Sequence, residues 1–246
     1  MINDLVKENE RVDDLQNGYY IIQDPRKFCF GMDAVLLSGF ARVKKGEKVL
    51  DMGTGTGIIP VLLASKTVGE HFTGLEIQEE CAEMAARSVK YNNLEDRVSI
   101  RQGDIKEAVS IFGAASFHVV TCNPPYKINN TGAKNDSEAV SIARHEMLCT
   151  IDDVCRCAKK NLKFGGRLCI CNRPERLCDI MTAMRANGIE PKRLRTVHKN
   201  PECPPWLILV EGKKGGKPFV QIEKPLYVRS ADGGNSAEMK RIYGLP

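Results

Sequence analysis

The chain has 246 residues, of which 42% are apolar, and its 36 basic and 31 acidic side chains give a net charge of +5. This length is sufficient for one well-cored domain, and the slight basic excess permits a polyanionic partner without requiring one. No stretch reaches the roughly 18 apolar residues of a membrane span, and the N-terminus lacks the apolar run of a secretory signal. We therefore expect a cytoplasmic protein with no membrane segment.

The ten cysteines are expected to be free thiols. Cys155 and Cys157 are separated by a single residue, as are Cys169 and Cys171, whereas zinc knuckles use a two-residue gap, and the histidines are scattered. The sequence therefore predicts no metal site, and free thiols are typical of a reducing compartment.

The N-terminal part of the chain is predicted to form a hairpin followed by a short helix. In DDLQNGYYIIQ, the Asn17-Gly18 pair lies between two short β-prone runs, which is typical of a tight β-hairpin. In the following segment, GMDAVLLSGFARV, Asp33 is predicted to cap a helix.

Strands and helices then alternate along the chain. The predicted strands are Lys48–Met52, His71–Ile77, Val98–Gln102 and Phe117–Cys122. Between them, one helix is predicted to begin near Ile58, a second to span Glu79–Tyr91, and a short third to begin near Ile105. This alternation is typical of a parallel sheet that is covered by helices on both faces.

The C-terminal part of the chain is predicted to complete the sheet. A long helical segment at about Ser137–Asn161 precedes the strand GRLCICN, which is followed by a helix at Glu175–Ala186. Two further strands, around Arg193–Val197 and Trp206–Val210, are joined by the tight connection HKNPECPP. The short connection predicts an antiparallel hairpin at the sheet edge.

Polar or glycine-rich residues follow four of the predicted strands. They are the turn Asp51-Met52-Gly53-Thr54-Gly55-Thr56-Gly57, then Glu76, then Asp104, and finally Asn123-Pro124-Pro125-Tyr126. In an open parallel sheet, ligands bind beyond the carboxyl ends of the strands, where the strand order switches. The sequence therefore predicts a ligand site at this edge.

The glycine-rich turn does not match the common phosphate-binding motifs. Ile58 occupies the place of the third glycine in a dinucleotide fingerprint, and no Gly-Lys-Ser/Thr follows a glycine-rich turn. Asp51 would repel a pyrophosphate, but it suits a ligand that bears an ammonium and a sulfonium, and Glu76 can accept both hydroxyls of a ribose. An ordinary tight turn is the alternative for the glycines alone, but the three carboxylates together favour S-adenosylmethionine.

The stretch NPPY after the fourth strand suits transfer to a conjugated amine. A plain turn could also end a strand in this way. However, the Asn123 side-chain oxygen and the Pro124 carbonyl can each accept one N–H of an exocyclic amine, whose lone pair is otherwise spread into the ring. Tyr126 offers a face on which a displaced base can stack, and Pro124 and Pro125 keep the group rigid. Asn123, Pro124, Pro125 and Tyr126 are therefore the predicted catalytic residues.

These ordered motifs resemble the class I S-adenosylmethionine-dependent methyltransferases that carry an N-P-P-Y motif, over nearly the whole chain. The segments FCFGMDAVLLSGF, ARHE at Ala143–Glu146 and AEMKRIYG further resemble the bacterial tRNA1(Val) adenine-N6 methyltransferase family. The resemblance implies an α/β, Rossmann-like fold with a mostly parallel seven-stranded sheet and a C-terminal antiparallel hairpin. It also implies a single methyltransferase domain, with residues 1–44 as an extension and residues 45–246 as the catalytic core.

The resemblance further implies an activity and a site. The activity is N6-methylation of an adenosine in tRNA, at position 37 beside the anticodon of tRNA1(Val), by a protein assumed to be monomeric that recognises the anticodon loop. The residues implied to bind S-adenosylmethionine are Asp51, Gly53, Thr54, Gly55, Gly57, Glu76, Ile77, Asp104, Ile105 and Asn123.

Three alternatives stay open at this point. The first is transfer to a glutamine side chain of release factors, although such enzymes usually carry a sizeable helical domain before the glycine-rich motif, and only about fifty residues precede it here. The second is guanine-N2 methylation of ribosomal RNA, where Phe is common at the position of Tyr126. The third is a non-catalytic RNA-binding protein of the same fold, which would not need Asn123.

Other polar residues carry weaker predictions. His145 and Glu146 are expected on a solvated helix face rather than as an acid/base pair, and Lys127–Glu138 is either a flap over the substrate or a disordered segment. Basic residues that gather late in the chain could contact RNA phosphates. They are Lys159, Lys160, Lys163, Arg167, Arg173, Arg176, Lys192, Arg193, Arg195, Lys199, Lys213, Lys214 and Lys217.

Overall fold

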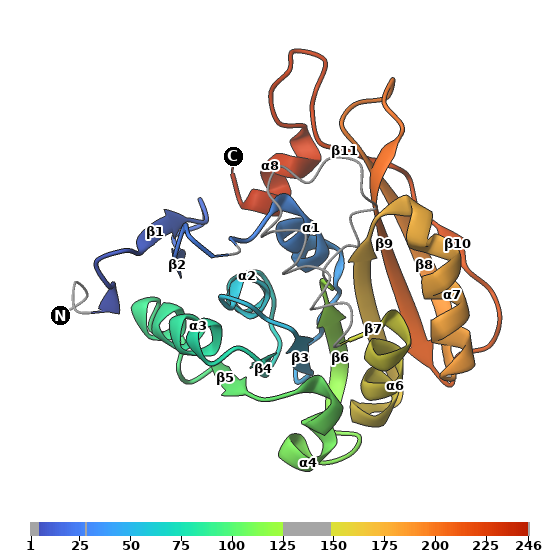
Figure 1. The fold of residues 1–246 in the computed structure, drawn as a ribbon. Coiled ribbons are helices and arrows are strands. Elements are labelled where there is room, and N and C mark those ends of the chain that lie inside the picture. Colours follow the sequence, from blue (N-terminus) through green and yellow to red (C-terminus); the bar gives the residue numbers. More distant parts are fainter. Residues whose placement is uncertain (1–4, 28, 125–148, 246) are drawn as a thin grey trace.

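The structure is a computed structural model that describes residues 5–27, 29–124 and 149–245. Within these residues the main sheet has seven long strands, in the order β8-β9-β7-β6-β3-β4-β5 (Figure 1). They are β3 (Lys48–Met52), β4 (His71–Glu76), β5 (Val98–Gln102), β6 (Phe117–Cys122), β7 (Leu162–Asn172), β8 (Ile189–His198) and β9 (Pro205–Lys214).

The strand directions confirm the predicted α/β architecture. Strands β5, β4, β3, β6 and β7 are parallel to one another, whereas β9 pairs antiparallel with both β7 and β8. Two short strands that were not predicted, β10 (Gln221–Ile222) and β11 (Leu226–Tyr227), pair in parallel with β8. The predicted seven-stranded sheet with its C-terminal hairpin is thus present and extended at one edge.

Helices cover both faces of the sheet, as Figure 1 shows. One face carries α1 (Met32–Phe40), α2 (Ile58–Lys66), α3 (Glu79–Tyr91) and α8 (Ala237–Tyr243), and the other carries α4 (Ala108–Phe112), α6 (Ile151–Asn161) and α7 (Leu177–Ala186). Alternate strand residues enter separate hydrophobic cores: Val49 and Val119 lie in the first, and Leu50 and Val120 in the second. This alternation explains why the central strands are apolar throughout.

The N-terminal extension is tied to the first of these faces. Strands β1 (Arg11–Asp14) and β2 (Tyr20–Gln23) form the predicted antiparallel hairpin as a separate two-stranded sheet. The Ile22 backbone N–H donates to the hydroxyl of Ser88 on α3 at 3.0 Å, and Arg87 of α3 forms an ion pair with Glu10 at 2.6 Å. The hairpin therefore docks on α3 through both burial and charge.

Two sequence predictions of helix ends are wrong. The N-cap of α1 is Gly31, and Asp33 lies inside the first turn, where its carboxylate accepts from the Ala34 N–H at 3.1 Å. The helical segment predicted from Ser137 does not run unbroken to Asn161, because Thr150 is extended and caps α6 through a reciprocal capping box with Asp153. Over the described residues, no helix has the length and apolar character needed to cross a membrane.

Candidate active site

The site predicted from the sequence lies at the switch point of the sheet. From β3 the chain continues to β4 and β5 on one side, whereas β6 and β7 lie on the other, so β3 and β6 are neighbours at the reversal. Their paired positions place Asp51 opposite Thr121 and Met52 opposite Cys122. The carboxyl ends of these parallel strands meet at the upper edge of the sheet in Figure 1, where ligands of such folds bind.

The turn after β3 owes its shape to its glycines. Gly53, Gly55 and Gly57 have φ values of 71°, 56° and 84°, in the left-handed region that side chains disfavour. A Cβ at Gly53 or Gly55 would meet nothing within 4 Å, so this side of the turn is open to a ligand. A Cβ at Gly57 would lie 3.1 Å from the Cβ of Ala85, so this glycine also allows α2 to approach α3.

Asp51 is a buried carboxylate with an incomplete set of partners. It is 1% exposed, and its Oδ1 accepts from the Thr121 hydroxyl at 2.7 Å. Neither Asp51 Oδ2 nor the buried Thr54 hydroxyl has a hydrogen-bond partner among the described residues. Burial raises the pKa of Asp51 to about 7; the hydrogen bond from Thr121 opposes the rise, and the charge of Glu76 adds to it. Among the described residues, no cation forms an ion pair with this buried acidic group.

Glu76, at the end of β4, holds the glycine-rich turn from the neighbouring strand. It is 5% exposed, its Oε2 accepts from the Gly55 N–H at 2.8 Å, and its Oε1 accepts from the Gln78 N–H at 3.0 Å. A carboxylate oxygen has two lone-pair sites, so both oxygens retain capacity for ligand hydroxyls. Ile77, which follows it, is 45% exposed and adds apolar surface at the same edge.

Asp104 and Ile105 follow β5 and begin a short helical turn. Asp104 caps the turn η2 (Ile105–Glu107) by accepting from the Lys106 N–H at 2.9 Å. Ile105 is partly buried against the second hydrophobic core. The third predicted carboxylate is therefore at the expected strand end, with its backbone fixed by a cap.

The described part of the NPPY stretch lies directly after β6. Pro124 is buried, and Asn123 Oδ1 accepts from the thiol of Cys171 on β7 at 3.0 Å. Cys171 is fully buried, so this contact fixes the carboxamide from the neighbouring strand. Pro125 and Tyr126 lie outside the described residues, as do His145, Glu146 and Lys127–Glu138.

Thr121 and Cys171 were not predicted as site residues. Thr121 is a polar residue in an apolar strand, and its relation to Asp51 depends on the pairing of β3 with β6. Cys171 has no sequence signal that separates it from Cys169 two residues earlier. Such second contacts become visible only when the strand order is known.

The late basic residues do not form one surface. Lys213 pairs with Arg167 and Lys214 pairs with Ile189, so these basic residues lie at the edge of the sheet opposite to Asn123. Arg173 and Lys199, in contrast, follow the ends of β7 and β8 at the same edge as the site. Arg193 is 7% exposed and forms ion pairs with Glu211 and Glu223 at 2.7 and 2.8 Å. The prediction that Arg193 contacts phosphates is therefore wrong, because its charge is buried and paired.

The described part of the chain contains no group of three or more His, Cys, Asp or Glu side chains arranged to hold a metal ion. The fold is that of an α/β protein whose switch point carries a glycine-rich turn and two buried carboxylates, Asp51 and Glu76. A family model described as a methyltransferase domain matches residues 43–218. The chain belongs to this family, as its sequence motifs predicted.

Curated relatives agree with this assignment, and a solved structure shares the fold. A Porphyromonas gingivalis protein named tRNA1(Val) (adenine(37)-N6)-methyltransferase is 29% identical over 224 residues, covering 86% of each chain. A Trichodesmium erythraeum protein of the same name is 27% identical, covering 82% of this chain and 84% of its own. A crystal structure from Agrobacterium tumefaciens, described as a predicted O-methyltransferase, has a TM-score of 0.71 at 20% identity and covers 87% of this chain and 96% of its own.

Proposed function

We propose that this protein is an S-adenosylmethionine-dependent methyltransferase that acts on N6 of an adenosine in tRNA, at position 37 beside the anticodon of tRNA1(Val). The observation that carries the proposal is the position of Asn123 and Pro124 at the end of β6, next to the strand whose end bears Asp51. A polar acceptor group and a site for a cationic cofactor are thereby neighbours. The names of the relatives support the choice of substrate.

The residues at the end of β3 and β4 fit this cofactor. The unpartnered Oδ2 of Asp51 and the unpartnered hydroxyl of Thr54 are buried polar atoms that a ligand ammonium can satisfy, and Gly53 and Gly55 leave the turn open. Glu76 would hold the ribose hydroxyls, beside Ile77, Asp104 and Ile105. When bound, S-adenosylmethionine supplies a methyl group on a sulfonium that is already activated toward a nitrogen nucleophile.

Asn123 and Pro124 orient the target amine. A carboxamide oxygen has two lone pairs, so Asn123 Oδ1, which accepts from the Cys171 thiol, is also of the right chemical type to accept one N–H of the substrate, while the Pro124 carbonyl can accept the other. Holding both N–H groups out of the ring plane restores the lone pair of the nitrogen. No strong base is required, because correct positioning contributes much of the rate and the proton can leave to water afterwards.

The N-terminal part of the chain disfavours the glutamine alternative. The described residues before β3 form a hairpin and α1 rather than a sizeable helical domain. Ile21 of the hairpin, Leu36 of α1 and Leu62 of α2 share one hydrophobic core, which supports a single domain with residues 1–44 as an extension of the catalytic core 45–246. We place this domain in the cytoplasm as a monomer that recognises the anticodon loop.

The proposal is tested with labelled S-adenosylmethionine and separate pools of tRNA, ribosomal RNA and release factor. We expect label in tRNA, recovered as N6-methyladenosine on nucleoside analysis. Label on guanine or on glutamine would overturn the proposal in favour of the corresponding alternative. Binding of RNA without transfer to any pool would favour the non-catalytic alternative.

Variants of the NPPY stretch separate alignment from stacking. Asn123→Ala should lower kcat on the order of 100-fold or more, because a preorganised polar contact is lost in the transition state. Tyr126→Phe should be mild because the ring remains, and Tyr126→Ala should be severe. A fully active Asn123→Ala variant would exclude the assigned role.

A further inference from the structure

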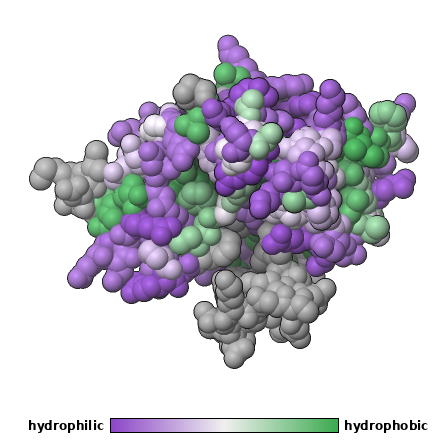
Figure 2. Space-filling view, turned by 90° about the horizontal axis from the view of Figure 1, so that it is seen from above, coloured by the Kyte–Doolittle hydropathy of each residue, from purple (hydrophilic) through white to green (hydrophobic). Residues whose placement is uncertain are grey.

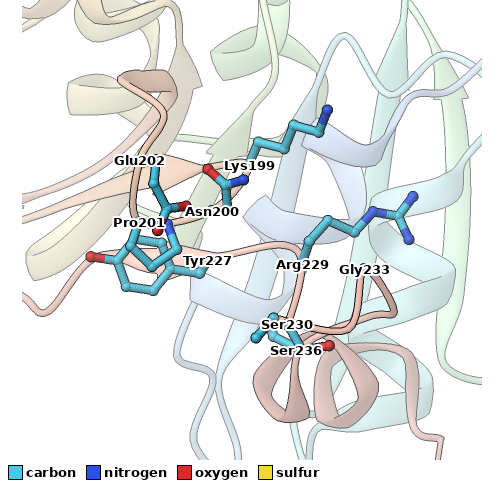
Figure 3. Close-up of a pocket in the computed structure, with 10 residues that line it drawn as sticks. Lys199, Asn200, Pro201, Glu202, Tyr227, Arg229, Ser230, Gly233 and Ser236 are labelled. Carbon is cyan, nitrogen blue, oxygen red and sulfur yellow. The ribbon is translucent and has the colours of Figure 1, made fainter.

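A second concave surface lies outside the site described above. A cleft of about 890 Å³ opens between the connection that follows β8 and the segment that follows β11 (Figure 3). Its lining includes Lys199, Asn200 and Glu202 from the first segment, and Tyr227, Arg229 and Ser230 from β11 and the second. The proposed methyltransferase chemistry uses none of these residues.

Backbone pairing places two cations side by side at this cleft. The Val228 N–H donates to the His198 carbonyl at 2.9 Å, and the Arg229 N–H donates to the Lys199 carbonyl at 2.8 Å. Figure 3 shows the side chains of Lys199 and Arg229 extending in the same direction. Within the described ranges neither forms an ion pair, and the Arg229 guanidinium donates to the neutral side chain of Asn235 at 3.3 Å. Two adjacent cations without an acidic partner are suited to a phosphate oxygen.

The rest of the cleft offers groups that suit a nucleobase. The Oδ1 atom of Asn200 is buried and has no hydrogen-bond partner among the described residues, so it is available to a ligand donor. The ring of Tyr227 contacts the ring of His198, with centroids 5.6 Å apart, and lines the cleft beside Pro201 and Glu202 (Figure 3). Glu202 is the acidic residue of the lining, so the two cations outnumber it. The cleft thus combines phosphate-binding charge with an aromatic ring and an amide.

The cleft and the proposed active site open at the same edge of the sheet. His198 ends β8 and pairs with Pro205 at the start of β9, while Asn172 at the end of β7 pairs with Ile208. Three strand spacings separate β8 from β6, which corresponds to roughly 14 Å. Viewed onto this edge, Figure 2 shows a largely hydrophilic surface. A nucleic acid strand that delivers a base to Asn123 would pass within reach of the cleft.

We propose that this cleft binds a phosphodiester of the substrate RNA strand through Lys199 and Arg229, with an adjoining base against Tyr227 and Asn200. The inference rests on the proposed function, and it places RNA docking at the site edge rather than on the late basic residues of the opposite edge. Single-stranded RNA fits because its bases are unpaired and can meet an aromatic ring and an amide.

The test compares two double variants of the full chain, with an unmodified tRNA transcript as the probe. Lys199→Ala/Arg229→Ala should weaken tRNA binding on the order of tenfold near 0.1 M salt and flatten the dependence of log affinity on log salt by about 1 to 1.5. Affinity for S-adenosylmethionine and kcat at saturating tRNA should be unchanged. The matched control is Lys213→Ala/Lys217→Ala, which removes the same charge from exposed lysines far from this edge. It should change neither the tRNA affinity nor its dependence on salt.

The outcomes separate this inference from the proposed function. If the wild type methylates tRNA but the Lys199/Arg229 variant keeps the full salt slope, the cleft inference is overturned and the function stands. Equal losses in both double variants would also overturn it, because general charge would then explain binding. If the wild type neither binds nor methylates tRNA, both fail. Should the double variant not fold, the single change Lys199→Glu at an exposed side chain gives the same readout.

Discussion

The two halves of the sheet differ in whether their buried charged side chains have ion-pair partners. In the half that ends in β8, Arg193 is 7% exposed and lies between Glu211 and Glu223, with its guanidinium over the ring of Phe40 at 4.2 Å. Burial alone would raise the pKa of Glu223, but the hydrogen bond and charge of Arg193 lower it below its ordinary value. Every charge in this group has a partner supplied by the protein.

In the other half, the buried carboxylates have no such partner. Asp51 accepts a hydrogen bond from the Thr121 hydroxyl, and Glu76 accepts hydrogen bonds from two backbone N–H groups. Neither carboxylate forms an ion pair among the described residues. A buried carboxylate without a cation is costly, and proteins retain such groups where function requires them. The ion pairs near β8 are therefore expected to maintain the fold, whereas our proposal assigns the cation for Asp51 to the cofactor.

The largest expected effect comes from breaking the paired group. Arg193→Met leaves Glu211, which is 5% exposed, without its cation, so we expect the free energy of unfolding to fall by about 3–5 kcal/mol. Urea unfolding measures this loss. The double variant Arg193→Met/Glu211→Gln should recover part of it, because the unpaired charge is then removed as well.

An exposed arginine provides the control for this change. Arg156 forms ion pairs with Asp152 and Asp153 on the surface of α6, and its side chain is 47% exposed. Arg156→Met should cost less than about 1 kcal/mol, since solvent screens such pairs. If both arginine variants lose the same stability, burial does not explain the contribution of the Arg193 group to the free energy of unfolding.

The next effect has the opposite sign. Because the pKa of Asp51 is raised to about 7 in the folded protein, the neutral carboxyl contributes stability that is fully present below about pH 4 and is lost as the pH rises through about 7. Asp51→Asn should therefore stabilise the cofactor-free protein at pH 8 by about 1–3 kcal/mol, with a gap that widens from pH 4 to pH 7. Thermal unfolding across this pH range checks the sign.

Cofactor binding should respond in the reverse direction. An ammonium favours the ionised carboxylate, so wild-type affinity for S-adenosylmethionine should rise with pH up to about 7, while Asp51→Asn binds roughly 1.5–3 kcal/mol more weakly. Asp24 shows the opposite pH dependence of stability. The hydrogen bond from Arg26 lowers the pKa of Asp24 to about 2, so the stability contributed by its ionised carboxylate, which Asp24→Asn removes, is lost as the pH falls. Unchanged affinity in Asp51→Asn, measured by calorimetry, would remove Asp51 from the cofactor site.

The sequence predicts which residues lie at the strand ends, but it does not predict which side chains meet across neighbouring strands. Asp51, Glu76, Asp104 and Asn123 could be placed at one edge because the carboxyl ends of parallel strands meet there. The Thr121 and Cys171 contacts could not, because they depend on which strands are adjacent. Arg193 looked like a surface cation among other basic residues, and only its pairing with β9 and the loop carrying Glu223 shows that it is buried.

Helix ends illustrate the same limit. Asp33 was a reasonable cap by residue type, but the N-cap of α1 lies two residues earlier, at Gly31. Thr150 ends the predicted long helix because a threonine followed by Asp153 forms a reciprocal cap, which competes with continuation of the helix. Local signals of similar strength compete, and tertiary packing decides among them.

A smaller effect is expected at Glu76, which has two functions. Glu76→Gln keeps one acceptor for the Gly55 N–H but removes the charge, so affinity for S-adenosylmethionine should fall by roughly 1.5 kcal/mol while the fold is retained. Glu76→Ala should lose up to about 3 kcal/mol, because the glycine-rich turn also loses its anchor. Calorimetry separates the two variants. NADH should bind to neither the variants nor the wild type, and NADH binding would contradict the cofactor assignment.

The smallest expected effect concerns a contact from the paired half of the sheet into the reaction site. Cys171 of β7 donates its thiol to Asn123 Oδ1 at 3.0 Å, and it is fully buried. If this contact keeps the carboxamide oxygen directed toward the target amine, Cys171→Ala should lower kcat by about 3- to 10-fold, the equivalent of one modest hydrogen bond. KM for S-adenosylmethionine should stay unchanged. Steady-state kinetics on tRNA gives both values.

A matched cysteine and a conservative change distinguish positioning from packing. Cys169 lies two residues earlier on β7, is equally buried in the same hydrophobic core, and contacts Glu211 rather than Asn123. Cys169→Ala opens a comparable cavity, so it should lower stability as Cys171→Ala does but leave kcat unchanged. Cys171→Ser keeps a donor and should restore kcat. Because a packing role predicts equal kcat for the two alanine variants and no rescue by serine, that result would show that the thiol supports only the core.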